Sequence, residues 1–219
     1  MKNNGRYDTS HLAESQYEPG SRGRVLRNKL VITKKREMEE IETQALQVAI
    51  DTLLDKYDAD YRFKETDIKI MHKLWLGEIY EWASVYRQVN MSKEDFTFAA
   101  GNQIPKLMTE FEKVTLHKHT PCNFKTQERI IQALAEVHVE FVLIHPFREG
   151  NGRVARILST VMASQAGLPI LNFADITARK RKHYYAAINN GMDRNYKPME
   201  EIFTSIIERT LKTRTDEMS

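Results

Sequence analysis

The sequence predicts an all-α fold with one small β-hairpin, and three observations lead to this prediction. Apolar residues recur at spacings of three and four along most of the chain, which is the period of one face of an α-helix. Residues 89–98 instead form two short alternating runs around a polar turn, the pattern of a hairpin. A chain of 219 residues with 41% hydrophobic content can bury one substantial core. We therefore expect one helical domain over residues 26–215, preceded by an irregular arm over residues 1–25.

Two helices are expected between the arm and the hairpin. The arm is polar and contains Gly and Pro, which favour irregular structure. The helices are expected at about residues 35–56 and 66–83, and Thr66 is the expected N-cap of the second because its hydroxyl can accept a backbone N–H. The apolar faces are formed by Met38, Ile41, Ala45, Val48, Ala49 and Leu53 in the first helix, and by Ile68, Met71, Leu74, Trp75, Ile79 and Trp82 in the second.

Five more helices are expected after the hairpin. A lone two-stranded hairpin is only marginally stable, so it must pack against these helices. The same spacing of apolar residues defines each of them. Their expected ranges are about 103–117, 126–144, 153–165, 177–190 and 198–212.

Composition excludes several classes of protein. The 33 Lys and Arg residues are interspersed with 30 Asp and Glu residues, and a net charge of +3 permits an acidic partner without demanding one. The single cysteine, Cys122, excludes an internal disulfide and a cysteine-based zinc finger. No stretch approaches the ~20 apolar residues of a membrane span, and the polar first residues lack the hydrophobic region of a signal peptide. We therefore expect a cytoplasmic protein that does not insert into a membrane.

The segment HPFREGNGRVAR, residues 145–156, interrupts two apolar helical runs with charged residues and glycines. Pro146 biases His145 away from the α region, so the preceding helix should end near Ile144. Gly150 and Gly152 permit unusual backbone angles, and a helix should begin near Arg153. A glycine loop that leads into a helix N-terminus points several N–H groups at one place, where the helix dipole also favours an anion. The segment therefore predicts an anion-binding loop.

The side chains around this loop indicate phosphate chemistry. Arg153 and Arg156 lie three residues apart, so both can grip separate phosphate oxygens from one side of the helix. Glu149 alone would repel a phosphate, which indicates that a hard cation such as Mg²⁺ lies between the two. The unperturbed pKa of a histidine side chain lies near neutrality, so His145 suits removal of a proton from an attacking hydroxyl. Phe147 should anchor the loop in the core.

A structural explanation competes with this one. Glu149, Arg153 and Arg156 could form a salt-bridged helix cap, with His145 as a hydrogen-bonded loop residue. For any one of these residues the structural explanation is favoured, but not for all of them at this spacing. No lysine and Ser/Thr follow the glycines, and no strand precedes them, so neither a Walker-type loop nor a dinucleotide fold is expected.

The same residues resemble the signature of the Fic family, His-x-Phe-x-Asp/Glu-Gly-Asn-Gly-Arg-x-x-Arg, at every specified position. The resemblance extends from about Leu26 to Leu211 through the helical pattern, the hairpin before the motif and a Tyr-Tyr pair after it. It implies the Fic fold, a helical bundle with a hairpin flap before the active-site loop. It also implies transfer of AMP from ATP to a Ser, Thr or Tyr hydroxyl of a target protein.

The resemblance assigns a role to each matching residue. His145 is similar to the family's catalytic base, and Glu149 to its Mg²⁺ ligand. The hairpin at Lys93 to Ala100 resembles the flap that holds an extended target segment by strand addition. The nucleotide-binding positions are Gly150, Asn151 and Gly152 as the anion hole, with Asn151 on the α-phosphate, Arg153 and Arg156 on the β- and γ-phosphates, and Tyr184 and Tyr185 at the adenine.

Several alternatives remain at this point. Related enzymes transfer another nucleotide or phosphocholine, or reverse the reaction. The basic run at residues 179–183 would suit a nucleic-acid-binding module, although no stacking aromatics are interleaved with it. His138 could form a metal pair with His145, but a buried, hydrogen-bonded histidine is the expected outcome.

Restraint of the activity has two possible origins. Residues 204–208 have the Ser/Thr-x-x-x-Glu spacing of an inhibitory helix found in the family, whose glutamate pairs with the second arginine of the motif. Glu208 would then pair with Arg156, but Arg209 stands where the family has Gly or Asn. An exposed Glu208 on the polar face of a helix is the favoured interpretation, in which case restraint comes from a separate inhibitory partner protein or is absent.

Overall fold

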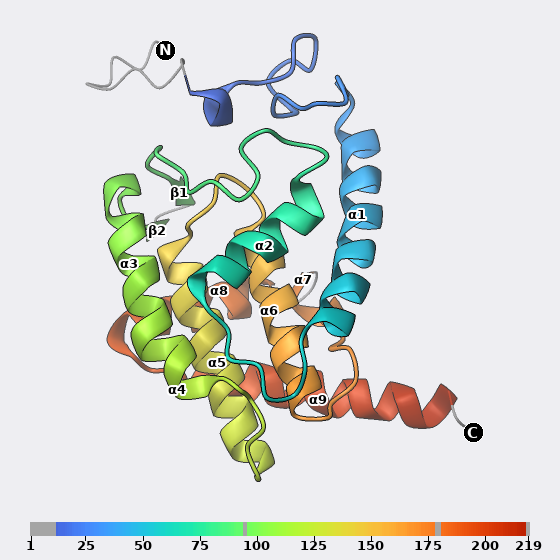
Figure 1. Ribbon diagram of the computed structural model, residues 1–219, viewed down its shortest axis with the longest axis vertical. Coiled ribbons are helices and arrows are strands. Elements are labelled where there is room, and N and C mark those ends of the chain that lie inside the picture. Colours follow the sequence, from blue (N-terminus) through green and yellow to red (C-terminus); the bar gives the residue numbers. More distant parts are fainter. Residues whose placement is uncertain (1–11, 94–95, 178–180, 218–219) are drawn as a thin grey trace.

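The computed structural model describes residues 12–93, 96–177 and 181–217, and it confirms an all-α fold. Helices α5 (Gln127–Ile144) and α6 (Asn151–Gln165) form the central pair. Helices α1 (Lys35–Lys56) and α2 (Glu65–Leu76) cover α6, whereas α8 (Arg181–Asn190) and α9 (Lys197–Glu217) pack on α5 (Figure 1). The loop that joins the central pair is the motif at residues 145–150.

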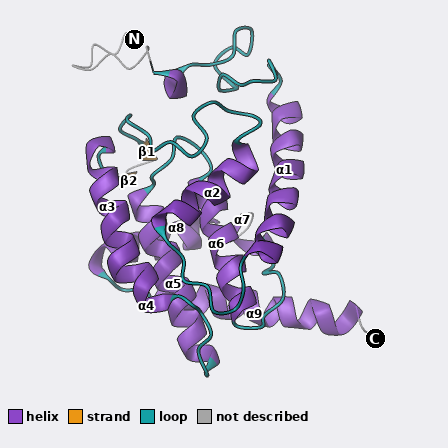
Figure 2. Cartoon of the chain, viewed as in Figure 1, coloured by secondary structure: helices purple, strands orange, loops and turns teal. Residues whose placement is uncertain are grey.

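The remaining elements are short. The hairpin pairs β1 (Ser92–Lys93) with β2 (Phe96–Thr97) in antiparallel register, Ser92 opposite Thr97 and Lys93 opposite Phe96. These strands are the only ones among the described residues, and they stand out against the helices in Figure 2. Single helical turns or short helices occur at Ala13–Ser15, Gly101–Gln103, α3 (Ile104–Glu110), Phe111–Leu116 in π geometry, α4 (His117–His119), α7 (Ala174–Thr177) and Gly191–Asp193.

The second predicted helix was wrong at both ends. Its N-terminus lies at Glu65 because the Asp67 carboxylate accepts the backbone N–H of Lys64 at 2.8 Å, so Thr66 is not the N-cap. The helix ends at Leu76, and the chain then folds back in tight turns until the N–H of Ser84 reaches Nδ1 of His72 at 2.7 Å. The apolar residues of this return segment are buried although they are not helical, which explains why the apolar spacing extended the prediction too far.

The other helices agree with the predicted ranges, with four differences. Helix α9 continues to Glu217, beyond the expected end near residue 212. The predicted helix at 103–117 contains a π turn at Phe111–Leu116. Helix α6 begins at Asn151, two residues before the expected position, because Gly150 takes a left-handed conformation as its N-cap. The predicted helix at 177–190 is described as α7 and α8, and residues 178–180 lie outside the described part of the chain.

The described part of the arm packs on the domain. Glu14 is 7% exposed, and its carboxylate accepts the backbone N–H groups of Gln88 and Val89 at 2.8 and 3.2 Å. Its carbonyl accepts Nε of Arg148 at 2.9 Å. The arm therefore contacts both the segment that leads to the hairpin and the motif loop.

One buried arginine joins the hairpin to the motif loop. Arg87 is 1% exposed, and its backbone N–H donates to the carbonyl of Pro146 at 2.9 Å. Its guanidinium fills the space between the two segments. It donates to the carbonyls of Val89 at 2.6 Å, Ala99 at 2.7 Å, His145 at 2.7 Å and Ile144 at 3.4 Å. Both sides of the hairpin are thereby held against the end of α5.

Among the described helices, none is both long enough and apolar enough to span a bilayer.

Replacing Arg87 tests whether this guanidinium holds the hairpin. We expect Arg87→Lys to lower the free energy of unfolding by about 2–4 kcal/mol, because one ammonium cannot reach carbonyls on both sides and buried acceptors lose their donors. Denaturant unfolding measures the change. Arg36→Lys is the matched control, since Arg36 forms an exposed pair with Glu40 and its replacement should change stability by less than about 0.5 kcal/mol. Equal midpoints for the two variants would contradict the assigned role.

Candidate active site

His145 sits at a sharp chain reversal. It is the C-cap of α5 with φ 53° and ψ 57°, a left-handed conformation, and the helix ends at Ile144 as expected from Pro146. Its backbone N–H still donates to Phe141 at 3.1 Å, which closes the last turn of the helix. A left-handed residue other than glycine is strained by about 1–3 kcal/mol and persists only where its surroundings fix it. Here the two arginine–carbonyl bonds and the buried Pro146 provide that support.

The imidazole of His145 is oriented for one role. Nδ1 lies 3.1 Å from the carbonyl oxygen of Val142, and because a carbonyl only accepts, Nδ1 carries the hydrogen in the neutral ring. Nε2 is then the nitrogen that can accept a proton. The ring of Phe98, from the flap, stacks on the imidazole at 3.7 Å with an interplanar angle of 18°. The flap therefore helps to set the plane of the base.

Phe147 anchors the loop, as predicted. Its side chain is fully buried and stacks on His72 of α2 at 3.9 Å with an interplanar angle of 3°. Nδ1 of His72 accepts the N–H of Ser84, so Nε2 carries the hydrogen and donates to the carbonyl of Glu149 at 3.2 Å. Burial lowers the pKa of His72 to about 4, which keeps the ring neutral at physiological pH. In this tautomer His72 binds the motif loop through the carbonyl of Glu149.

Asn151 and Gly150 fix the start of α6. The Asn151 side chain is buried, with Oδ1 accepting the N–H of Phe147 at 2.8 Å and Nδ2 donating to the carbonyl of Phe147 at 2.7 Å. Nδ2 carries a second hydrogen, which is the one that the predicted contact with an α-phosphate would use. That contact stays a prediction. Gly150 has φ +87°, and an added Cβ would lie 2.5 Å from the Trp75 ring. The loop thus requires glycine for both conformation and space.

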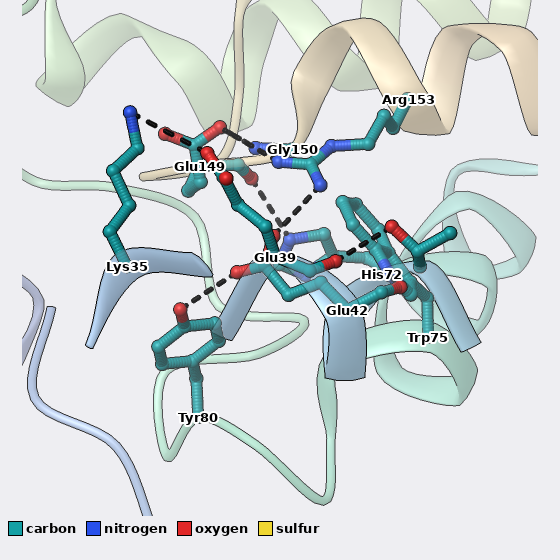
Figure 3. A network of polar contacts seen from close by, with 10 residues as sticks. Lys35, Glu39, Glu42, His72, Trp75, Tyr80, Glu149, Gly150 and Arg153 are labelled. Carbon is teal, nitrogen blue, oxygen red and sulfur yellow. Dashed lines mark hydrogen bonds and ion pairs between the residues drawn. The ribbon is translucent and has the colours of Figure 1, made fainter. Parts of the chain in front are cut away.

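The two arginines of the motif have different surroundings. Arg153 donates from Nη1 to Oε2 of Glu42 at 2.8 Å, lies 3.6 Å from the Glu149 carboxylate and stacks over Trp75 at 4.6 Å (Figure 3). By contrast, no acidic side chain in the described ranges forms an ion pair with Arg156. Burial lowers the pKa of the Arg156 guanidinium, because removal from water disfavours its charge. Arg156 is therefore a partly buried cation without a carboxylate, which favours an incoming anion.

All the predicted nucleotide-binding residues line one cavity. Its volume is about 640 Å³, within the range of roughly 300–1,000 Å³ that is typical of small-molecule sites. Phe96 and Phe98 of the flap line it together with residues of the motif. The predicted positions that it contains are His145, Glu149, Gly150, Asn151, Gly152, Arg153, Arg156, Tyr184 and Tyr185.

Helix α8 also lines this cavity. Tyr184 is 7% exposed, and its hydroxyl lies 2.8 Å from Nε2 of His138, whose Nδ1 lies 3.1 Å from Oγ of Ser159. Burial lowers the pKa of His138 to about 3, so it is the neutral, hydrogen-bonded histidine that was favoured over a metal ligand. Tyr185 is half-buried and accepts Nε of Arg181 at its hydroxyl at 3.0 Å. Arg181, from the basic run, thus belongs to the cavity wall.

Glu208 does not take the inhibitory position. It lies on the exposed face of α9 and is not part of the cavity that contains Arg156. No ion pair joins the two residues, both of which the structure describes. The favoured interpretation of Glu208 as a solvent-exposed residue is the one that the structure supports.

Sequence reasoning missed three supporting residues, although each left a signal. Glu42 is a carboxylate on the apolar stripe of α1 between Met38 and Ala49, and it is 5% exposed. His72 lies on the buried face of α2 in the same way. Arg87 is a charged residue beside buried aromatic segments, but nothing in its spacing indicates which carbonyls it meets.

Sequence comparisons relate this chain to known proteins. Residues 62–163 match the model of the Fic/DOC family. A Nematostella vectensis protein named protein adenylyltransferase Fic is 27% identical over 194 residues, covering 85% of this chain and 42% of the relative. The protein adenylyltransferase VbhT of Bartonella schoenbuchensis is 27% identical over 151 residues, covering 67% of this chain and 30% of the relative. The chain therefore spans less than half the length of these two curated relatives.

Solved structures share the fold. The N-terminal Fic domain of an effector protein from a Bartonella species superimposes with a TM-score of 0.71 at 23% identity, covering 92% of this chain and 95% of that domain. The BepC protein of Bartonella tribocorum, whose structure contains bound AMPPNP, gives a TM-score of 0.70 at 23% identity and covers 90% and 97%. With the intact motif at residues 145–156, the cavity that it lines and the match over residues 62–163, the chain contains a domain of the Fic/DOC family.

Proposed function

We propose that this chain is a protein adenylyltransferase, which transfers AMP from ATP to a Ser, Thr or Tyr hydroxyl of a target protein. One observation carries the proposal: a histidine with Nε2 poised as a base and an anion-binding loop with Arg156 line the same cavity. The names of the curated relatives support the choice of AMP. Enzymes of the family that use another nucleotide or reverse the reaction share the motif, and they remain the alternative.

The proposed reaction uses His145 and the anion-binding loop in one step. The target hydroxyl loses its proton to Nε2 of His145, and its oxygen attacks the α-phosphorus of ATP. The bond between the α-phosphorus and the bridging oxygen breaks, and pyrophosphate leaves with that oxygen. The left-handed conformation of His145 and its place in the cavity beside Gly150 support this role, because a pre-positioned base needs little reorganisation at the moment of transfer.

The phosphates would bind at the N-terminus of α6. Backbone N–H groups at the first turn of this helix and the positive end of its dipole favour negative charge. Arg156 adds a guanidinium that no carboxylate neutralises, and Arg153 adds a second at the rim of the cavity. Tyr184 and Tyr185 of α8 are the proposed contacts of the adenine.

Mg²⁺ is part of the proposal. No cluster of three or more potential ligands occurs among the described residues, but Mg²⁺ commonly uses one or two carboxylates together with substrate phosphates. Glu149 fits this arrangement, because its carboxylate is 47% exposed and lines the cavity beside the loop. When bound, the ion would neutralise charge on the phosphates, and Glu149 is the residue that would hold it.

The flap, Lys93 to Ala100, is the proposed binding site of the target. Residues 94–95 lie outside the described part, but the paired strands and Phe98 on the imidazole place the hairpin beside the base. An extended peptide that adds to a strand edge is held by its backbone, with little side-chain selectivity. A target loop bound there would deliver its hydroxyl to His145. The protein would act in the cytoplasm, with ATP as co-substrate.

A nucleic-acid-binding module is less well supported. Arg179 and Lys180 lie outside the described residues, Arg181 lines the cavity, and no observation places a nucleic acid on the basic run. We propose that a separate inhibitory protein, rather than Glu208, restrains the enzyme.

His145→Ala tests the base. We expect transfer of labelled AMP to fall at least ~100-fold, because a positioned general base contributes that much or more. Nucleotide binding, measured by calorimetry, should stay within a few-fold of wild type, since other groups bind the phosphates. Near-normal labelling by this variant would refute the mechanism.

Glu149→Gln tests the metal. The Mg²⁺ concentration for half-maximal transfer should rise roughly tenfold or more, because a neutral amide is a poor ligand for a hard cation. A titration of activity with MgCl₂ measures it. Wild-type activity that persists in EDTA would show that the assignment of Glu149 is wrong.

Glu208→Gly tests restraint within the chain. Because Glu208 is exposed and outside the cavity, self-labelling by this variant should equal that of wild type within about twofold. Strongly increased labelling would mean that Glu208 reaches the site in solution and would restore the inhibitory-helix hypothesis.

A further inference from the structure

A buried carboxylate on α1 contacts the phosphate-binding motif from outside the segment that matches the family. Glu42 is 5% exposed, and burial of a carboxylate is costly unless its oxygens are satisfied. Both are: Oε1 accepts the hydroxyl of Tyr80 at 2.8 Å, and Oε2 accepts Nη1 of Arg153 at 2.8 Å. The backbone carbonyl of Glu42 also accepts Nε1 of Trp75 at 2.8 Å (Figure 3).

This arrangement fixes the guanidinium of Arg153 on three sides. Glu42 binds one terminal nitrogen, the Trp75 ring lies beneath the guanidinium at 4.6 Å, and Glu149 is 3.6 Å from the other terminal nitrogen. A guanidinium has five N–H donors, so one bond to Glu42 leaves others for a ligand. Arg153 retains 29% exposure of its side chain and lines the cavity. Its orientation is set before any ligand arrives.

Stability alone does not account for such a pair. A buried ion pair often contributes no more to folding than apolar residues of the same volume would. Arg156, three residues further along the same helix, lines the cavity without any carboxylate partner among the described residues. Helix α6 therefore carries one arginine that is oriented by α1 and one that is not. This difference indicates a specific use for the orientation.

We propose that Glu42 is a positioning residue, which holds Arg153 at the rim of the cavity so that it can bind the terminal phosphates of the nucleotide. Helix α1 thereby takes part in the selection of a nucleoside triphosphate over a monophosphate. The inference rests on the proposed function, because Arg153 is the group through which Glu42 acts. Tyr80 supports it by binding the other carboxylate oxygen.

The test compares two ligands on the same folded protein. Glu42→Gln keeps the size of the side chain but removes its charge, so the charge-assisted bond to Arg153 is lost. Its affinity for ATP, measured by calorimetry with Mg²⁺, should fall about tenfold, the loss expected for one charge-assisted hydrogen bond. Its affinity for AMP should be unchanged, because AMP has no terminal phosphates at Arg153. Glu40→Gln, on an exposed position of the same helix, is the matched control and should change neither affinity.

Two further variants separate positioning from folding. Tyr80→Phe removes only the support of Oε1 and should reduce ATP affinity by a smaller factor than Glu42→Gln, with AMP again unaffected. In an Arg153→Gln background, Glu42→Gln should have no further effect on ATP affinity, because contacting residues that act as one unit are not additive. Tyr80→Phe gives a result even if Glu42→Gln folds poorly.

Each outcome is distinguishable. Equal losses of ATP and AMP affinity would show a structural role and overturn the inference. Tighter ATP binding by Glu42→Gln would overturn it too, because Glu42 would then compete with phosphate for Arg153. Failure of the proposed function is a different result, in which the wild-type protein binds ATP no better than AMP or transfers no AMP to any protein.

Discussion

The site depends on the burial of Phe147 in the middle of a polar loop. Its ring stacks on His72, and both polar atoms of its backbone are bound by the Asn151 side chain. This anchor separates the left-handed His145 on one side from the glycine turn and α6 on the other. Without it, His145 and the glycine turn would lie on a flexible connection, and the strain at His145 would relax. With it, two functional groups are fixed to the two central helices.

Supporting residues from distant parts of the chain complete this loop. Arg87 binds the carbonyls on both sides of the hairpin and at the end of α5, so the flap and the base share one rigid contact. Glu42 orients Arg153 from α1, and His72 holds the carbonyl of Glu149 from α2. Helices that carry no motif residue therefore determine where the motif residues lie. Pre-organisation of this kind is the principal means by which a site binds developing charge without reorganisation.

The sequence was sufficient for the fold class and for the motif, but not for its supports. Apolar spacing located α1 and α5 closely, because these helices bury one face along their whole length. It failed at residues 77–83, where Ile79 and Trp82 are buried in turns, since burial alone does not distinguish a turn from a helix. The left-handed His145 and the partner of Glu42 arise from tertiary contacts, which local pattern does not contain. Arg153 and Arg156 looked equivalent in sequence and differ only through the side chains around them.

We propose that the motif loop directs attack of the target hydroxyl at the α-phosphorus. The most direct measurement incubates the wild-type protein with Mg²⁺, a cell lysate and ATP that is labelled on either the α- or the γ-phosphate. We expect the α-label to appear on protein and the γ-label not to, because the β- and γ-phosphates leave as pyrophosphate. Transfer of γ-label to protein would contradict it, since the loop would then present the terminal phosphate to His145.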